Sequence, residues 1–301
     1  MSGDICNNAA ANIPSTRKSI MLRIAVPNKG SLSEIAAEML HEAGYAGRRD
    51  PRALSVRDER NDVEFFYLRP RDIATYVGSG DLDLGVTGRD LLVDSGADAV
   101  EILDLGFGAA TFRFAAAPGT VPRVAALAGK RIATAYPGVV ARHLSTLGLA
   151  ARVVRLDGAV ENAVRLGVAD AVADVVSTGA TLRQAGLEPL GEPILESVAV
   201  LVRRAGPDGD GPVAQLLRRL QGVLVARRYV LLAYDVPAAA LTRACALTPG
   251  FESPTISPLQ RQGWVAVQSM VARAEVHRVM DELYEVGARA ILVTDIHACR
   301  L

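Results

Sequence analysis

The sequence predicts an α/β protein of two similar lobes, followed by a small C-terminal domain of ferredoxin-like order. Short apolar runs alternate with amphipathic segments from Met21 to Val176, a pattern that predicts a mainly parallel sheet. An acid, a Thr and a Gly recur with the same spacing at 83–88 and 174–179, as expected if two related lobes face each other across a cleft. The elements after residue 228 follow the order β-α-β-β-α-β.

Composition and charge limit the classes of function. The chain has 301 residues, half of them hydrophobic, and 33 basic residues balance 33 acidic ones, so no overall field attracts nucleic acid or an anionic membrane. No apolar run reaches the roughly 18 residues of a membrane helix. The first 20 residues lack the apolar core of a secretory signal, and we expect them to be a disordered extension. Cys6, Cys245 and Cys299 are odd in number and far apart, which favours a reduced cytoplasm.

The elements of the two lobes are expected in chain order. Alternation predicts the first strand at 22–27, and helical spacing of Leu32, Ile35 and Met39 predicts a helix over 31–43, closed by Gly44. By the same criteria, strands are expected at 63–68, 101–105, 112–117, 131–134, 152–155 and 171–176. Helices are expected to end at Val77 and at Leu166, to begin at Arg89 and at Thr181, and to span 139–147.

The C-terminal elements follow a long helix at 213–226. The expected elements there are strand 229–234, helix 238–246, strands 255–259 and 264–271, helix 275–286 and strand 290–293. Domains of this order often bind small ligands as regulators, although fold alone establishes no function.

The stretch Asp174–Thr181 is the first candidate site. An apolar strand ends there in Ser177, Thr178, Gly179, Ala180 and Thr181, and a helix follows, so amides and hydroxyls converge as they do in phosphate seats. Asp174 would repel a phosphate, but a carboxylate can accept hydrogen bonds from sugar hydroxyls. A ribose 5-phosphate fits both features, and a plain turn with a helix cap remains the alternative.

Cations are expected at the ends of neighbouring strands. Lys29 precedes Gly30 after the first strand, Arg69 and Arg71 follow the second, and Gly88 with Arg89 opens a helix. Open α/β sheets place ligands at the carboxyl ends of their strands, so these side chains predict a cleft for a polyanion. Solvated loop cations are the alternative for each residue taken alone.

Acids and an aromatic residue complete the second lobe. Asp157, Gly158 and Glu161 form a tight acidic turn, in which Glu161 either caps its helix or acts with Asp174 on ribose hydroxyls or, through water, on magnesium. Tyr136 either lines the cleft or packs in the core.

Two common site types are not supported. The four histidines have no shared spacing and no local Asp or Ser partner, which argues against a nucleophilic triad. There is no Walker lysine motif and no GxGxxG after the first strand.

Several blocks together resemble a known family. They are Val-Pro-Asn-Lys-Gly-Ser-Leu at 26–32, Leu-Arg-Pro-Arg-Asp-Ile at 68–73, Gly-Val-Thr-Gly-Arg-Asp at 85–90, Leu-Asp-Gly-Ala-Val-Glu at 156–161, residues 167–182, Gly-Glu-Pro-Ile-Leu-Glu-Ser at 191–197 and Thr-Pro-Gly-Phe-Glu-Ser-Pro-Thr at 248–255. In this order, from Met21 to Leu301, the chain resembles the long form of ATP phosphoribosyltransferase, the first enzyme of histidine biosynthesis.

The resemblance implies a fold and its domains. Two periplasmic-binding-protein-like lobes of type II form the catalytic part, with residues 21–108 and 201–228 in lobe I and residues 109–200 in lobe II. Residues 229–301 form a ferredoxin-like, ACT-type regulatory domain that binds histidine. A homo-oligomer, passing from dimer to hexamer, is implied as well.

The resemblance also implies the reaction and its residues. The 5-phosphoribosyl group of phosphoribosyl pyrophosphate joins N1 of the adenine of ATP, pyrophosphate leaves, and Mg²⁺ neutralises its charge. Catalytic roles then fall to Lys29, Arg69, Glu161 and Asp174. Substrate binding falls to Gly30, Gly88, Arg89, Tyr136, Asp157, Gly158, Ser177, Thr178, Gly179, Ala180 and Thr181.

L-Histidine is the implied feedback inhibitor. Its pocket is expected at Asp235 and Thr255, completed by Phe251, Met270 and Ala290. Two other classes of protein remain as alternatives: a two-lobed small-molecule-binding protein without catalysis, and a phosphoribosyltransferase on a Rossmann-like fold. The latter usually carries two adjacent acids before its Thr/Gly run, whereas here Ala173 precedes Asp174.

Overall fold

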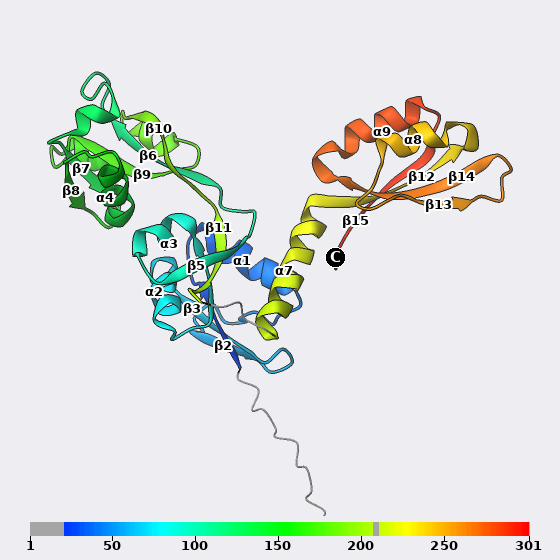
Figure 1. Ribbon diagram of the computed structural model, residues 1–301, viewed down its shortest axis with the longest axis horizontal. Helices are drawn as coiled ribbons and strands as arrows, with labels where there is room; N and C mark the ends of the chain where they lie inside the picture. Colours follow the sequence, from blue (N-terminus) through cyan, green and yellow to red (C-terminus); the bar gives the residue numbers. More distant parts are fainter. Residues whose placement is uncertain (1–20, 207–210, 301) are drawn as a thin grey trace, which may run out of the picture.

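The structure, a computed structural model, describes residues 21–206 and 211–300, so the expected disordered extension at 1–20 lies outside the described residues. It contains three sheets, one for each lobe and one for the C-terminal domain (Figure 1). None of the helices described is long and apolar enough to cross a membrane.

Lobe I is built on a six-stranded sheet of order β2-β3-β1-β4-β11-β5. Its strands are β1 (Leu22–Pro27), β2 (Ser55–Asp58), β3 (Val63–Leu68), β4 (Leu84–Gly88), β5 (Ala99–Asp104) and β11 (Ala199–Arg204), and its helices are α1 (Ser31–Glu42), α2 (Pro70–Ser79), α3 (Arg89–Ser95) and α7 (Pro212–Arg228). Strand β1 pairs in parallel with β3 and β4, while β11 runs antiparallel to β4 and β5. The late return of the chain through β11 therefore completes the sheet of lobe I.

Lobe II repeats this arrangement with five strands in the order β10-β6-β9-β7-β8. Its elements are β6 (Ala110–Ala116), β7 (Arg131–Thr134), α4 (Pro137–Thr146), β8 (Arg152–Arg155), α5 (Asn162–Arg165), β9 (Ala171–Val176), α6 (Ala180–Gln184) and β10 (Glu188–Ser197). The central strand β7 is parallel to β8 and β9, and β6 is antiparallel to β9 and β10.

Apart from the additional edge strand β2 of lobe I, the two sheets have the same strand order, which confirms two periplasmic-binding-protein-like lobes. In each lobe one strand comes from a segment that crosses between the lobes. In lobe I this strand is β11, between β4 and β5, and in lobe II it is β6, between β9 and β10. The expectation of a mainly parallel sheet is wrong outside the centre of each lobe, because these crossing strands and their neighbours pair antiparallel.

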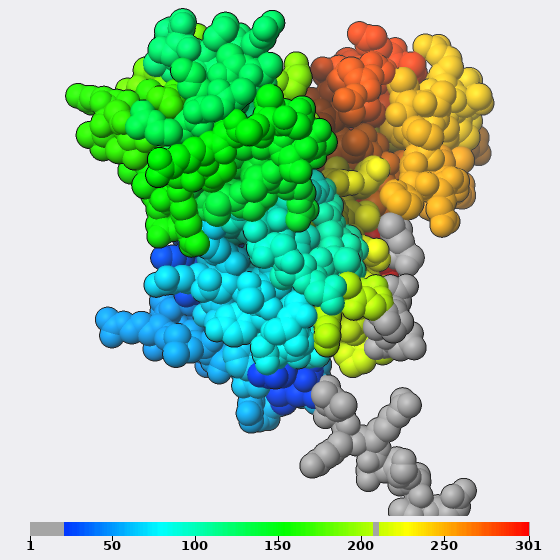
Figure 2. Space-filling model, turned by 60° about the vertical axis from the view of Figure 1, so that its left-hand side comes forward, coloured from blue at the N-terminus to red at the C-terminus, as the bar shows by residue number. Residues whose placement is uncertain are grey.

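The lobes are joined by two chain crossings that lie side by side. The amide of Leu105 donates to the carbonyl of Ala199 at 2.9 Å, and the amide of Ala199 donates to Phe107 at 2.8 Å. Figure 2 shows lobe II, in green, packed above lobe I, in blue and cyan. Carboxyl ends of strands from both lobes therefore face a common space.

The C-terminal domain confirms the ferredoxin-like order. Its antiparallel sheet has the order β13-β14-β12-β15, formed by β12 (Tyr229–Pro237), β13 (Thr255–Pro258), β14 (Trp264–Ala272) and β15 (Arg289–Asp295). Helices α8 (Leu241–Leu247) and α9 (Val276–Glu285) cover one face, and β12 alternates buried and half-buried residues accordingly. Helix α7 passes into β12 without an intervening loop, since one ends at Arg228 and the other begins at Tyr229.

Candidate functional site

A cavity of about 380 Å³ lies between the two lobes. Lobe I contributes the loop after β1 and the end of β4, and lobe II contributes Tyr136 and the end of β9. Among the predicted site residues, those that line it are Lys29, Gly30, Gly88, Tyr136 and Ser177. Five residues predicted from separate motifs thus share one cavity, as the cleft hypothesis requires.

Two of the predicted cations are free to meet an anion. Lys29 follows β1 and Arg69 follows β3, and these parallel strands are adjacent, so both cations lie at the same edge of the sheet. Both side chains are exposed, and neither forms an ion pair with a residue that the structure describes. This edge therefore carries positive charge that no carboxylate of residues 21–206 or 211–300 pairs with.

The other two cations are bound to carboxylates of their own lobe. Arg71 pairs with Asp94 at 2.8 Å. Arg89 donates to Glu101 at 2.7 and 2.8 Å and approaches Asp104 at 3.4 Å, which raises the pKa of Arg89. Arg89 also does not line the cavity, so the structure does not bring it together with the other predicted residues.

The loop from Ser177 to Thr181 presents unused donors. Ser177, Thr178, Ala180 and Thr181 are exposed, and Gly179 has a left-handed φ of 70°, which turns the chain into α6. The amides of Thr178, Gly179 and Thr181 donate to no acceptor within the described residues. Helix α6 has only five residues, so the helix dipole adds little, and the local amides and hydroxyls carry any affinity for phosphate.

Asp174 lies on the last part of β9, opposite Arg113 on β6. Burial, together with the nearby carboxylates of Glu161 and Asp90, raises its pKa to about 6, although the amide of Val175 donates to its Oδ1 at 2.8 Å. A carboxylate that is costly to ionise gains most when a ligand supplies donors to it. Sugar hydroxyls are such donors.

This raised pKa leads to a prediction about stability. Between pH 4 and 6 the folded chain keeps a proton on Asp174 that the unfolded chain has released, so stability falls as the pH rises through this window. At pH 8 we expect the Asp174→Asn variant to be more stable than wild type by about 3 kcal/mol, because the pKa is raised by about two units and each unit corresponds to about 1.4 kcal/mol. Urea unfolding at pH 8 and pH 4 measures the difference, which should vanish at the lower pH. An equal difference at both pH values would contradict the burial of this charge.

Tyr136 approaches a buried acid of the other lobe. Burial and the charge and hydrogen bonding of Asp90 raise the pKa of Tyr136, so its hydroxyl stays protonated. The Ser197 hydroxyl donates to Asp90 Oδ1 at 2.7 Å, and the Asp90 amide donates back to it at 3.1 Å. Gly88 lacks a Cβ because one there would overlap the Asp90 carboxylate. These contacts set one wall of the cavity.

A direct contact between the lobes lies beside this wall. Asp94 of α3 accepts hydrogen bonds from the Gly138 amide at 2.8 Å and the Val139 amide at 3.3 Å, both at the start of α4. Arg71, paired with Asp94, also lies over the Tyr136 ring at 4.9 Å. A Cβ on Gly138 would overlap the Asp94 carbonyl, so the lobes approach as closely as the backbone allows.

We expect Gly138→Ala to push the lobes apart. A displacement of about 1 Å at reacting groups lowers kcat/KM by roughly tenfold or more, and the radius of gyration from small-angle X-ray scattering should rise. Gly47→Ala is the matched control, because a Cβ there meets nothing within 4 Å. If the two variants behave alike, the lobe contact does not set the geometry of the cavity.

The acidic turn of lobe II does not line the cavity, although Glu161 lies near Asp174. Asp157 and Gly158 are exposed, and Asp157 approaches Arg155 at 3.5 Å. Glu161 is the N-cap residue of α5 but makes no side-chain capping bond, and its charge acts on Asp174. Glu161 therefore does not cap its helix through its side chain, but it does lie close enough to Asp174 to act on its charge.

The structure brings together some, but not all, of the residues predicted to bind free histidine. Asp235, Thr255 and Ala290 line a cavity of about 320 Å³ on the face of the sheet opposite α8 and α9. Ala290 has a left-handed φ of 48° within an irregularity of the pairing between β12 and β15. Phe251 instead packs against the Tyr229 ring at 5.7 Å, and Met270 pairs with Leu231, so neither lines this cavity.

Sequence reasoning missed Asp90, Asp94 and Ser197. Ser197 lies 107 residues from Asp90, so no local spacing reports their hydrogen bond. Asp90 and Ser197 are the last residues of two sequence blocks named above, Gly-Val-Thr-Gly-Arg-Asp and Gly-Glu-Pro-Ile-Leu-Glu-Ser. Membership of these blocks was the sequence signal that could have identified them.

Comparisons with known proteins agree with this site. The family model "HisG: ATP phosphoribosyltransferase" matches residues 69–222, and the model for the HisG C-terminal domain matches residues 226–298. An ATP phosphoribosyltransferase of Salinispora tropica is 68% identical over 281 residues, which are 93% of this chain and all of that protein. One from Streptomyces avermitilis is 63% identical over 285 residues, with the same coverage of both chains.

A solved structure is similar as well. It is the ATP phosphoribosyl transferase (HisG:HisZ) complex from Thermotoga maritima, with a TM-score of 0.58 and 28% identity over 68% of this chain and 98% of that chain. The family models, the identities over full-length relatives and this fold all agree. The chain belongs to the ATP phosphoribosyltransferase family.

Proposed function

We propose that the chain transfers the 5-phosphoribosyl group of phosphoribosyl pyrophosphate to N1 of the adenine of ATP, giving 1-(5-phosphoribosyl)-ATP and pyrophosphate. This is the first step of L-histidine biosynthesis. The observation that carries the proposal is identity of 68% to an ATP phosphoribosyltransferase along its whole length. The cavity between the lobes, lined by Ser177 on one side and Lys29 on the other, is the place that we assign to the reaction.

Lobe II holds the sugar phosphate in this proposal. Asp174 accepts hydrogen bonds from the ribose hydroxyls. These hydrogen bonds favour the ionised carboxylate, so the fraction of Asp174 that is protonated in the free protein, with its pKa of about 6, loses its proton when the sugar binds. The amides and hydroxyls from Ser177 to Thr181, including the backbone of Gly179 and Ala180, hold the 5-phosphate. Asp157, Gly158 and Glu161 close the same pocket around the sugar.

Lobe I supplies the positive charge. Lys29 and Arg69 are unpaired at one sheet edge, and they meet the pyrophosphate and the triphosphate. Gly30 and Gly88 line the cavity, and because they have no side chains the substrate can lie close to their backbone. Tyr136 offers a protonated hydroxyl and an aromatic face. Arg89 takes part only if its bond to Glu101 is exchanged for substrate.

The reaction requires little proton transfer. Adenine N1 carries a lone pair and attacks C1 of the ribose with inversion, while the bond from C1 to the pyrophosphate oxygen breaks and its electron pair leaves with pyrophosphate. The sugar acquires oxocarbenium character, which the carboxylates of Asp174 and Glu161 stabilise. Catalysis therefore consists of positioning and charge stabilisation, which explains why no triad is needed.

Magnesium accompanies the substrates rather than a protein site. The described residues include no group of three or more His, Cys, Asp and Glu side chains arranged to hold a metal ion. Mg²⁺ is commonly bound through substrate phosphates with one or two carboxylates, so we assign it to the pyrophosphate and triphosphate. It neutralises their charge when bound.

The C-terminal domain is the proposed site of histidine feedback. Asp235, Thr255 and Ala290 line its open cavity, with Asp235 the partner for a cationic amino or imidazole group. Phe251 and Met270, which lie outside the cavity, contribute only if the effector reaches beyond it. We further place the protein in the cytoplasm as a homo-oligomer, dimer or hexamer, where Cys245 and Cys299 are free thiols.

A single assay tests both claims. We expect absorbance of phosphoribosyl-ATP to grow when ATP, phosphoribosyl pyrophosphate and Mg²⁺ are supplied, and growth to slow on addition of histidine. The second candidate is a binding protein of the same two-lobed fold without catalysis. Tight binding of phosphoribosyl pyrophosphate with no product would favour that candidate.

A further inference from the structure

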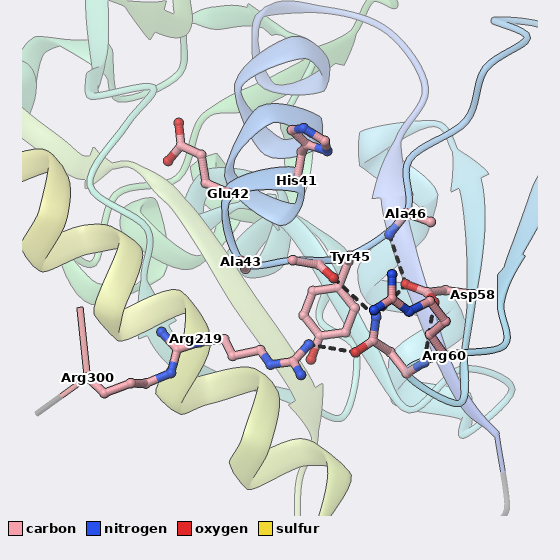
Figure 3. A pocket seen from close by; sticks show the side chains of 11 residues that line it. His41, Glu42, Ala43, Tyr45, Ala46, Asp58, Arg60, Arg219 and Arg300 are labelled. Carbon is pink, nitrogen blue, oxygen red and sulfur yellow. Dashed lines mark hydrogen bonds between the residues drawn. The ribbon is translucent and has the colours of Figure 1, made fainter. Parts of the chain in front are cut away.

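A second cavity, of about 690 Å³, lies in lobe I and shares no lining residue with the cavity between the lobes. Three parts of the chain form it: the end of α1 with the turn to Ala46, the turn between β2 and β3, and α7 together with Arg300 near the C-terminus (Figure 3). The cavity therefore joins the catalytic lobe to a segment that follows the last strand of the C-terminal domain.

Three guanidinium groups line this cavity. Arg219 of α7 points toward Tyr45, lying over its ring at 4.9 Å, and donates to Asn61 Oδ1 at 2.7 Å (Figure 3). Arg60 and Arg300 form no ion pair with any carboxylate in the described part of the chain. Arg219 is thus oriented by neutral groups, and none of the three guanidinium groups is paired with a carboxylate of the described residues.

The two carboxylates that line the cavity already accept hydrogen bonds from other groups. Asp58 is buried and accepts hydrogen bonds from the Ala46 amide at 2.8 Å and from Asn61 Nδ2 at 2.7 Å. Glu42 receives two hydrogen bonds from Arg227, at 2.8 and 3.0 Å. Glu42 is thus paired with Arg227, whereas Asp58 keeps its negative charge, so within the described residues the lining carries three arginines against one carboxylate without a cationic partner.

The position of Arg300 is set by close packing on α7. A Cβ on Gly222 would overlap the Cys299 carbonyl, so glycine lets the C-terminal segment lie directly on the helix. Gly222 follows Arg219 by three residues and lies on the same face of α7, which brings Arg300 next to Arg219. A bound anion would be attracted to both positive charges.

We propose that this cavity binds an oxyanion of the phosphate class and that its occupancy holds the segment 299–300 on the catalytic lobe. Guanidinium groups bind phosphate oxygens in a bidentate manner, and three arginines from three segments of the chain line this cavity. Free inorganic phosphate and the phosphate of a nucleotide share this chemistry. The site is separate from the proposed reaction and does not depend on it.

Alkylation of Cys299 in the full chain tests the proposal. Cys299 is half-buried in the segment that the anion would hold, and Cys245 in the C-terminal domain serves as the internal reference. With inorganic phosphate at ten times its dissociation constant, we expect labelling of Cys299 to slow by roughly tenfold, since only the free form opens. Labelling of Cys245, followed by mass spectrometry in the same sample, should not change.

Charge-neutral variants locate the effect. Arg60→Gln and Arg300→Gln should each remove the protection, whereas Arg218→Gln, one position along α7 and outside this cavity, should retain it. Protection by phosphate and adenosine monophosphate assigns the site to the shared phosphate group, and protection by phosphate alone assigns it to the free anion. Equal protection by sodium chloride at matched ionic strength, or undiminished protection in Arg60→Gln, would overturn the proposal.

Discussion

We expect Asp174→Asn to lower kcat for phosphoribosyl-ATP formation by roughly 10² to 10³-fold while raising the stability of the free protein. The substitution keeps the shape of the side chain and the acceptor for the Val175 amide, so only the negative charge is lost. That charge is needed in the transition state, when the ribose carries positive character, and is a burden in the free protein, where burial raises the pKa to about 6. Initial rates with both substrates saturating measure the loss.

The matched control is Glu188→Gln. Glu188 is exposed in the same lobe and pairs with Ala116, at the end of the sheet away from Asp174. Its loss should leave kcat unchanged. Thr181→Ala, at the phosphate end of the loop, should chiefly raise KM for phosphoribosyl pyrophosphate. A wild-type rate in Asp174→Asn would remove this residue from the site.

The second large effect concerns histidine. We expect Asp235→Ala to raise the histidine concentration for half-inhibition by roughly ten- to a hundredfold, since a hydrogen bond to a charged group contributes about 1.5–3 kcal/mol. The uninhibited rate should stay the same, because Asp235 lies on the open face of the C-terminal sheet and not in the cavity between the lobes. Inhibition curves on the wild type and the variant decide this.

Asp281→Ala serves as the control for that experiment. Asp281 is exposed on α9, which covers the opposite face of the same sheet. The variant removes the same charge from the same domain without touching the cavity. Unchanged inhibition in Asp235→Ala would place the effector elsewhere.

Much of the fold was predictable from local pattern. The strands at 63–68, 131–134, 152–155 and 171–176 have the bounds expected from their apolar runs, because each is short and flanked by turn residues. The strands β2, β10 and β11 were not anticipated. Strand β10 contains Pro189, Gly191 and Pro193 and an irregular pairing with β6, so its sequence does not resemble a regular strand.

The candidate site was predictable by residue type but not by charge pairing. Lys29 and Arg69 form no ion pair within the described residues, whereas Arg71 and Arg89 are neutralised by Asp94 and Glu101, acids 23 and 12 residues away. Neither partner follows a spacing that sequence can report. The raised pKa of Asp174 also depends on burial and on acids from other segments, which only the folded chain brings together.

The junction between α7 and β12 has a mechanical consequence. Helix α7 spans 17 residues and is about 25 Å long. It continues directly into strand β12 of the C-terminal sheet, with no loop residue between 228 and 229. Figure 1 shows it as the bridge between lobe I and that sheet. A tilt of the C-terminal domain therefore cannot be absorbed at the junction and must turn the helix as a lever against the core of lobe I, where Leu216, Leu220 and Val223 are buried.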